Sequence, residues 1–88
     1  MKLLFEKKFL KEVSNLNDAK LQTAIEEIIN ESERAQNTSQ IKNIKKLKGF
    51  KNAYRIRVGE YRIGILVEKS TIIFVRFMHR KEVYKYFP

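Results

Sequence analysis

The sequence predicts an α+β domain in which an N-terminal strand and a helical hairpin precede a three-stranded antiparallel meander. Two observations indicate this class. Apolar residues recur at helical spacing between residues 7 and 34, and they alternate or run continuously between residues 53 and 78, as strands require. A chain of 88 residues is long enough for one small core, so we expect a single domain over residues 1–88 with both helices packed on one face of one sheet.

The first forty residues predict the strand and the helical hairpin. Residues 2–5 are a short apolar run suited to a strand, and two amphipathic stripes follow it. Asn17 or Asp18 can cap the second helix, because a short side-chain oxygen accepts hydrogen bonds from the first free amides. Since few residues join the helices, they fold back on each other, and core packing is favoured over a partner groove. The apolar positions are Phe9, Leu10, Val13, Leu16, Leu21, Ala24, Ile25, Ile28 and Ile29.

The segment from residue 41 to residue 48 has a weaker pattern. Ile41, Ile44 and Leu47 are spaced by three among lysines, and Gly49 ends the segment. This spacing predicts either a short helical turn or an irregular segment pinned by its apolar side chains.

The stretch from residue 54 to residue 65 predicts a β-hairpin with a glycine-first turn at residues 59–60. Side chains in a strand alternate between its two faces, so Arg55 and Arg57 share one face and Arg62 joins them from the second strand. Three guanidiniums on one face of a rigid sheet indicate an anion site. The predicted arginine-bearing face contains Arg55, Arg57, Arg62 and Gly64. Gly64 has no side chain and therefore leaves room beside the guanidiniums.

The last predicted strand covers residues 71–78, whose nearly unbroken apolar content is typical of a central strand buried on both faces. Arg76 interrupts this run near its end, and we expect it to make a structural or partner contact. The tail at residues 79–88 predicts a short helical turn with Val83 and Phe87 facing inward.

Composition excludes several classes of site. There is no cysteine and only one histidine, so neither disulfides nor thiolate or histidine-rich metal sites are expected, and we expect no metal or other cofactor. No apolar run approaches the ~20 residues that span a bilayer. These features predict a cytoplasmic protein without a membrane partner.

The net charge of +9 is concentrated in the second half of the chain. Residues 1–40 hold six Lys or Arg against seven Asp or Glu, whereas residues 41–88 hold thirteen against three. This asymmetry favours an anionic partner, of which nucleic acid is the commonest. The alternative is a lysine-rich surface that serves solubility alone.

Three motifs in the second half resemble the RelE/ParE superfamily of toxins from bacterial toxin–antitoxin pairs. They are Leu-Lys-Gly at residues 47–49, Tyr-Arg-Ile-Arg-Val-Gly-Glu-Tyr-Arg-Ile at residues 54–63, and His-Arg-Lys-Glu-Val-Tyr at residues 79–84. The resemblance implies a cognate antitoxin, often acidic, and a toxin–antitoxin hetero-oligomer. Similarity to the RelE-like branch implies a toxin that inhibits translation by cutting messenger RNA on the ribosome, so the ribosome and mRNA are expected partners.

The resemblance also implies roles for individual residues. Basic residues on the hairpin and after the last strand correspond to Arg55, Arg57, Arg62 and Arg80, and the C-terminal aromatic that stacks on a base corresponds to Tyr84, with Tyr86 as a second candidate. Lys46, Lys48 and Lys51, together with Lys42 and Lys45, are candidate contacts to RNA phosphates, the alternative being a solvated lysine face.

The chemistry expected of such a nuclease requires no metal, because the RNA 2′-hydroxyl attacks the neighbouring phosphorus. Guanidiniums suit the charge that develops on the phosphate. An arginine is a very poor base, so His79 is the preferred proton acceptor and Glu60 the second. Two other functions remain open: a ParE-like inhibitor of DNA gyrase, and a non-catalytic member that only binds its antitoxin or nucleic acid.

Overall fold

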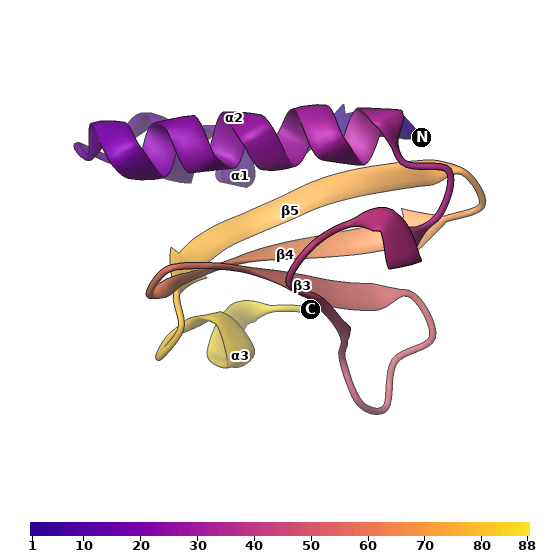
Figure 1. The fold of residues 1–88 in the computed structure, drawn as a ribbon. Coiled ribbons are helices and arrows are strands. Elements are labelled where there is room, and N and C mark those ends of the chain that lie inside the picture. The colour runs from indigo at the N-terminus through magenta and orange to yellow at the C-terminus, as the bar shows by residue number, and fades with distance from the viewer.

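The computed structural model describes residues 1–88 as a five-stranded sheet with two helices on one face and a short helix on the other (Figure 1). The strand order is β1-β5-β4-β3-β2, and only the β1–β5 pair is parallel. The predicted α+β class is therefore confirmed. The elements are β1 (Lys2–Phe5), α1 (Lys7–Ser14), α2 (Ala19–Arg34), a 3₁₀ turn (Thr38–Gln40), β2 (Ile44–Lys46), β3 (Ala53–Val58), β4 (Tyr61–Glu68), β5 (Thr71–His79) and α3 (Val83–Tyr86).

The α1–α2 hairpin covers the face that carries the main core. Of the two predicted caps, Asp18 begins α2, and its carboxylate accepts a hydrogen bond from the Leu21 amide at 3.1 Å. Phe9 and Ile25 of the helices are buried against the strands, which contribute fully buried residues such as Ile56. No helix in the structure has both the length and the apolar character needed to cross a membrane.

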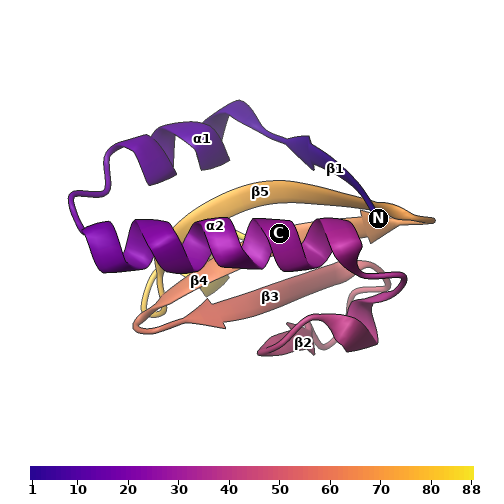
Figure 2. The ribbon, with the colours of Figure 1, turned by 45° about the horizontal axis from the view of Figure 1, so that its top comes forward.

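β5 lies between β1 and β4, so it is an interior strand, as expected. The expected burial on both faces was wrong, because only Ile72, Phe74 and Phe77 are buried and the residues between them are partly exposed. β1 pairs with only the first half of β5, in the register Lys2↔Thr71 to Phe5↔Phe74. Beyond that point the chain leaves the sheet and enters α1, which continues beside β5 (Figure 2). The second half of β5 thus has a free edge next to α1.

The opposite face of the sheet carries a smaller apolar cluster. Val83 and Phe87 of the C-terminal segment are buried there together with Ala53 of β3. The inward orientation predicted for Val83 and Phe87 is confirmed. Their burial holds α3 against this face of the sheet, which we call the α3 face.

The prediction for residues 41–48 was wrong, and the meander has four strands instead of three. Ile44–Lys46 forms the edge strand β2, antiparallel to β3 in the register Ile44↔Ile56. Asn43 adopts a left-handed backbone (φ 62°), and the chain is extended after it. In this extended segment successive side chains alternate between the two faces of the sheet, so the spacing of three between the apolar residues does not indicate a helical turn.

Candidate nucleic-acid interface

The three hairpin arginines share the α3 face, as their alternation predicts. In the β3–β4 pairing, Arg57 is opposite Arg62 and Arg55 is opposite Gly64. The intervening residues Ile56 and Val58 are buried in the main core on the other face. Directly opposed residues of antiparallel strands lie on the same side of a sheet, so these side chains project from one surface.

None of these three guanidiniums is neutralised by a carboxylate within 4.0 Å. Arg55 donates to the Asn43 carbonyl at 2.8 Å, and Arg62 donates to the carbonyls of Gly59 (3.0 Å) and Tyr61 (2.9 Å). Carbonyl contacts orient a guanidinium without cancelling its charge. The surface is therefore positioned and positively charged, which suits a phosphate.

β2 adds one further cation, Lys45, to this surface. The sequence pattern alone did not distinguish Lys45 from the neighbouring lysines. Lys45 is opposite Arg55 in the β2–β3 register, so it lies on the α3 face. Lys46 is opposite Tyr54 and alternates to the other side. Had β2 been predicted as a strand, alternation around Ile44 would have distinguished these two lysines.

The room beside Gly64 is occupied, contrary to the expectation that it serves the arginines. A Cβ atom at Gly64 would lie 2.7 Å from ring atoms of Phe87. Glycine thus admits the aromatic ring that anchors the C-terminal segment against the sheet. As a result, α3 is held beside the arginines, and its Tyr84 and Tyr86 remain more than half exposed.

His79 does not join the arginines, so the expected convergence was wrong for this residue. It is opposite Tyr61, and its ring meets the edge of the Tyr61 ring, which stacks on buried Phe77. These rings belong to the helix-bearing face, while Met78 alternates to the face of Arg62. The His79 Nδ1 atom accepts a hydrogen bond from the Lys81 amide at 3.2 Å.

Arg80 lies at the end of the sheet, next to the β3–β4 turn. Its Nε atom is 2.7 Å from a Glu60 carboxylate oxygen, and its amide donates to the Glu60 carbonyl at 2.9 Å. Both side chains are largely exposed, so the ion pair contributes little to stability. The contact places one further cation and one carboxylate at the β3–β4 turn, whose Gly59 and Tyr61 carbonyls accept hydrogen bonds from Arg62.

The two remaining lysines predicted to bind RNA, Lys48 and Lys51, lie in the exposed loop between β2 and β3. Lys46, at the end of β2, joins them in lining a shallow hollow of about 380 Å³ formed by residues 46–51. Figure 1 shows the β2–β3 loop on the α3 side of the sheet, with α3 between this loop and the β3–β4 turn. Lys46 itself belongs to β2, and its register with Tyr54 places it toward the helix-bearing face.

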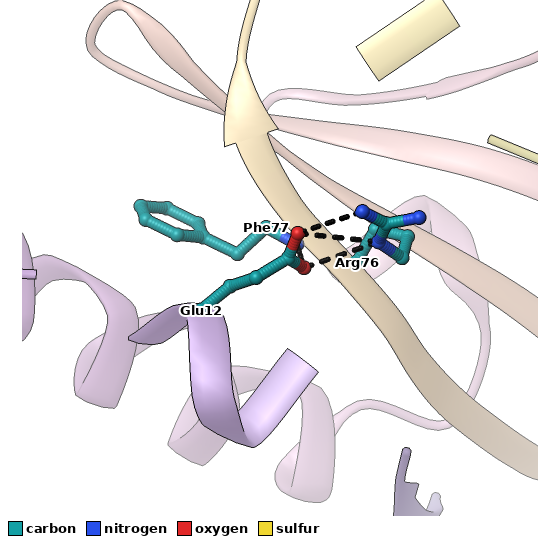
Figure 3. Close-up of polar contacts among 3 residues, drawn as sticks. All are labelled: Glu12, Arg76 and Phe77. Carbon is teal, nitrogen blue, oxygen red and sulfur yellow. Dashed lines mark hydrogen bonds and ion pairs between the residues drawn. The ribbon is translucent and has the colours of Figure 1, made fainter. Parts of the chain in front are cut away.

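Arg76 has a structural partner that local sequence could not reveal. Its Nε and Nη2 atoms donate to the Glu12 carboxylate at 3.2 and 2.8 Å, and Glu12 also accepts from the Phe77 amide at 2.9 Å (Figure 3). Glu12 thereby provides an acceptor for one amide on the part of the β5 edge that β1 does not pair with. These hydrogen bonds raise the pKa of Arg76 above its usual value, so it stays charged. Its guanidinium carbon also lies 5.9 Å from the Tyr86 ring centroid.

Possible metal ligands are dispersed through the structure. No group of three or more His, Asp or Glu side chains is placed to hold an ion, and the chain has no cysteine.

Comparison with known families places this sheet among the type II toxins. A family model described as the ParE toxin of type II toxin–antitoxin systems, parDE, matches residues 3–84. The chain belongs to the ParE toxin family. The superfamily predicted from the three motifs is therefore confirmed.

Relatives of this ParE-family chain extend over its whole length. It is 47% identical over 89 residues to Toxin RelE3 of Methanocaldococcus jannaschii, with 100% of both chains covered. Its structure is similar to a chain of the RelB–RelE antitoxin–toxin complex from Methanococcus jannaschii, with a TM-score of 0.79 and 43% identity. The match covers 97% of this chain and 99% of the other. The YoeB dimer from Staphylococcus aureus, at TM-score 0.71, 21% identity and coverage of 91% and 97%, shares the fold.

Proposed function

We propose that this chain is the toxin of a toxin–antitoxin pair and that it cuts messenger RNA bound to the ribosome. The observation that carries the proposal is the row of hairpin arginines on the α3 face. Carbonyls hold Arg55 and Arg62, and none of the three arginines has a carboxylate partner. Full-length similarity to a protein named Toxin RelE3 supports the same conclusion.

In this proposal the RNA supplies its own nucleophile. The 2′-oxygen attacks the adjacent phosphorus, and the bond to the 5′-oxygen breaks. The leaving 5′-oxygen takes a proton from water, so the products carry a cyclic phosphate and a 5′-hydroxyl. Arg55, Arg57 and Arg62 stabilise the negative charge that builds on the non-bridging oxygens, because each guanidinium presents two parallel donors and stays protonated. Arg80 supplies a further cation from the end of the sheet.

The proton of the 2′-hydroxyl needs an acceptor that arginine cannot provide. Two titratable groups border the arginines: Lys45, opposite Arg55, and Glu60, in contact with Arg80. We assign the acceptor role to one of these two groups and not to His79, whose ring lies on the helix-bearing face.

The exposed tyrosines of α3 and the lysines of the β2–β3 loop complete the RNA-binding surface. Tyr84 and Tyr86 offer stacking surfaces, each worth roughly 1–3 kcal/mol per base. Lys46, Lys48 and Lys51 contact backbone phosphates. The same positive surface fits an acidic antitoxin segment, and the complex of the similar RelE with RelB is the precedent for such a partner.

The test is a cleavage assay with purified toxin, ribosomes and a defined message. We expect cuts within the codon in the A site, with 5′-hydroxyl ends, and suppression of the cuts by the cognate antitoxin. An intact message at excess toxin would contradict nuclease activity. Broken DNA and a DNA-damage response in expressing cells would instead indicate gyrase inhibition.

A binding role without catalysis is the second candidate, because the expected histidine base is absent from the arginine face. Under that hypothesis the toxin binds ribosomes that carry a message, or binds its antitoxin, and leaves the RNA uncut. The same assay separates the two functions when binding and cleavage are measured on the same sample.

A further inference from the structure

A hollow of about 420 Å³ separates the β2–β3 loop from the C-terminal segment. Leu47 and Phe87 contribute apolar surface to it, and Phe50 and Tyr84 line it from the two different segments. Its full lining is Leu47, Lys48, Phe50, Tyr84, Phe87 and Pro88.

Two of these aromatic rings are exposed to an extent that core packing does not explain. Phe50 is 49% exposed and Tyr84 is 59% exposed, although both side chains are large. The loop presents Phe50 by a turn at Gly49, whose φ of 88° is strained for any residue with a Cβ atom. The Phe50 amide closes this turn on the Leu47 carbonyl at 3.3 Å.

The charge around the hollow is positive. Lys48 lines this hollow and also the neighbouring one formed by residues 46–51, which Lys46 and Lys51 border. None of these lysines forms an ion pair with a carboxylate. A ligand that matches both features has a flat apolar surface and an adjacent negative charge, which describes a nucleotide of a single strand.

We propose that the hollow between Phe50 and Tyr84 binds one unpaired base of the RNA, with Lys48 and Lys51 on the adjoining phosphates. The proposal rests on the RNA-directed function above and deepens it, because the base that stacks on Tyr84 gains a second aromatic wall. Its new element is Phe50, a residue that the motif resemblance does not assign. An acidic peptide with an apolar side chain is the competing occupant, but it uses the aromatic walls less fully than a base does.

The test uses a short single-stranded RNA that carries the fluorescent base 2-aminopurine and is blocked by 2′-O-methyl groups against cleavage. Stacking quenches this base, so titration of the purified chain reports both affinity and stacking. We expect Phe50→Ala to weaken binding about tenfold and to remove most of the quenching. Phe50→Trp should retain both, because it preserves an aromatic face.

Leu10→Ala is the matched control, since Leu10 is a similarly exposed apolar side chain (52%) on α1, on the other side of the sheet. It should bind like the wild type. Equal affinity and quenching in Phe50→Ala and wild type would overturn the subsite, as would a wild type that shows no quenching either free or on programmed ribosomes. A Phe50→Ala defect confined to antitoxin binding would assign the hollow to the antitoxin instead.

This outcome is independent of the proposed nuclease activity. RNA binding that depends on Phe50, without cleavage by the wild type, would support the subsite and contradict the nuclease. If the wild type cleaves RNA but binding does not depend on Phe50, the nuclease is supported and the subsite is contradicted.

Discussion

The two faces of the sheet differ in what covers them and in what they carry. The helix-bearing face contributes to a cluster of eleven buried hydrophobic residues, whereas the α3 face has a cluster of three. The smaller cluster leaves most of the α3 face free for Lys45, Arg55, Arg57 and Arg62. The helix-bearing face therefore contributes most of the buried core, whereas the α3 face of the same sheet carries the exposed cations.

Replacing an arginine of the α3 face should have the largest effect on activity. We expect Arg62→Ala to lower cleavage of a ribosome-bound message by about 10²–10³, the usual cost of losing one well-aimed donor to a developing anion. The thermal midpoint should change little, since Arg62 is bonded only to carbonyls of its own turn.

Arg34→Ala is the matched control, because Arg34 is an exposed arginine at the end of α2. It should cleave at the wild-type rate. Equal losses in both variants would show that net charge, and not the position of Arg62, determines activity.

Glu12→Gln should have the largest effect on stability. The substitution leaves the mostly buried Arg76 guanidinium without a counter-charge and weakens the bond to the Phe77 amide. We expect a loss of about 2–3 kcal/mol in the free energy of unfolding, measured by urea titration. Glu82→Gln, which removes an exposed pair with Lys85 at 4.0 Å, should cost less than about 0.5 kcal/mol. Similar costs for the two variants would contradict a structural role for the Glu12 contact.

Gly64→Ala should disturb the α3 face while leaving the main core intact. The new methyl group overlaps the Phe87 ring, so the ring and α3 must move. We expect a loss of about 1–3 kcal/mol, together with faster proteolysis after Tyr84 and weaker RNA binding. Unchanged protection of the C-terminal segment would show that Phe87 does not anchor α3 at Gly64.

His79→Ala should have the smallest effect on cleavage and sharpens the contrast between the faces. Because His79 lies on the helix-bearing face, we expect a change of less than about twofold, whereas loss of the proton acceptor beside the arginines should cost ~10²–10⁴. Lys45→Arg and Glu60→Gln identify that acceptor when compared in the same assay. A tenfold loss in His79→Ala, with both other variants active, would return the base to His79.

The sequence predicted the fold class and the arginine face because both depend on short-range periodicity. Alternation in residues 54–65 is enough to place Arg55, Arg57 and Arg62 together. β2 was missed because Ile41, Ile44 and Leu47 are three apart and the left-handed turn at Asn43 leaves no pattern. The face of His79 depends on the register of β4 against β5.

Longer-range contacts were beyond local reasoning. Glu12 and Arg76 are 64 residues apart, and their pairing follows from where β1 leaves the edge of β5. The contact between Gly64 and Phe87 similarly requires the C-terminal segment to fold back on the sheet. In both cases the sequence shows an unusual residue, an arginine in an apolar run or a glycine in a strand. It does not show which distant residue makes the contact.

The most direct measurement replaces one hydroxyl of the substrate. A defined message with a single 2′-deoxynucleotide at the mapped cut site is placed in the ribosomal A site, and its cleavage by the wild-type chain is compared with that of the all-RNA message. If the α3 face stabilises attack by the 2′-oxygen, cleavage at that site stops while the toxin still binds the ribosome. Continued cutting at the deoxy position would contradict the mechanism.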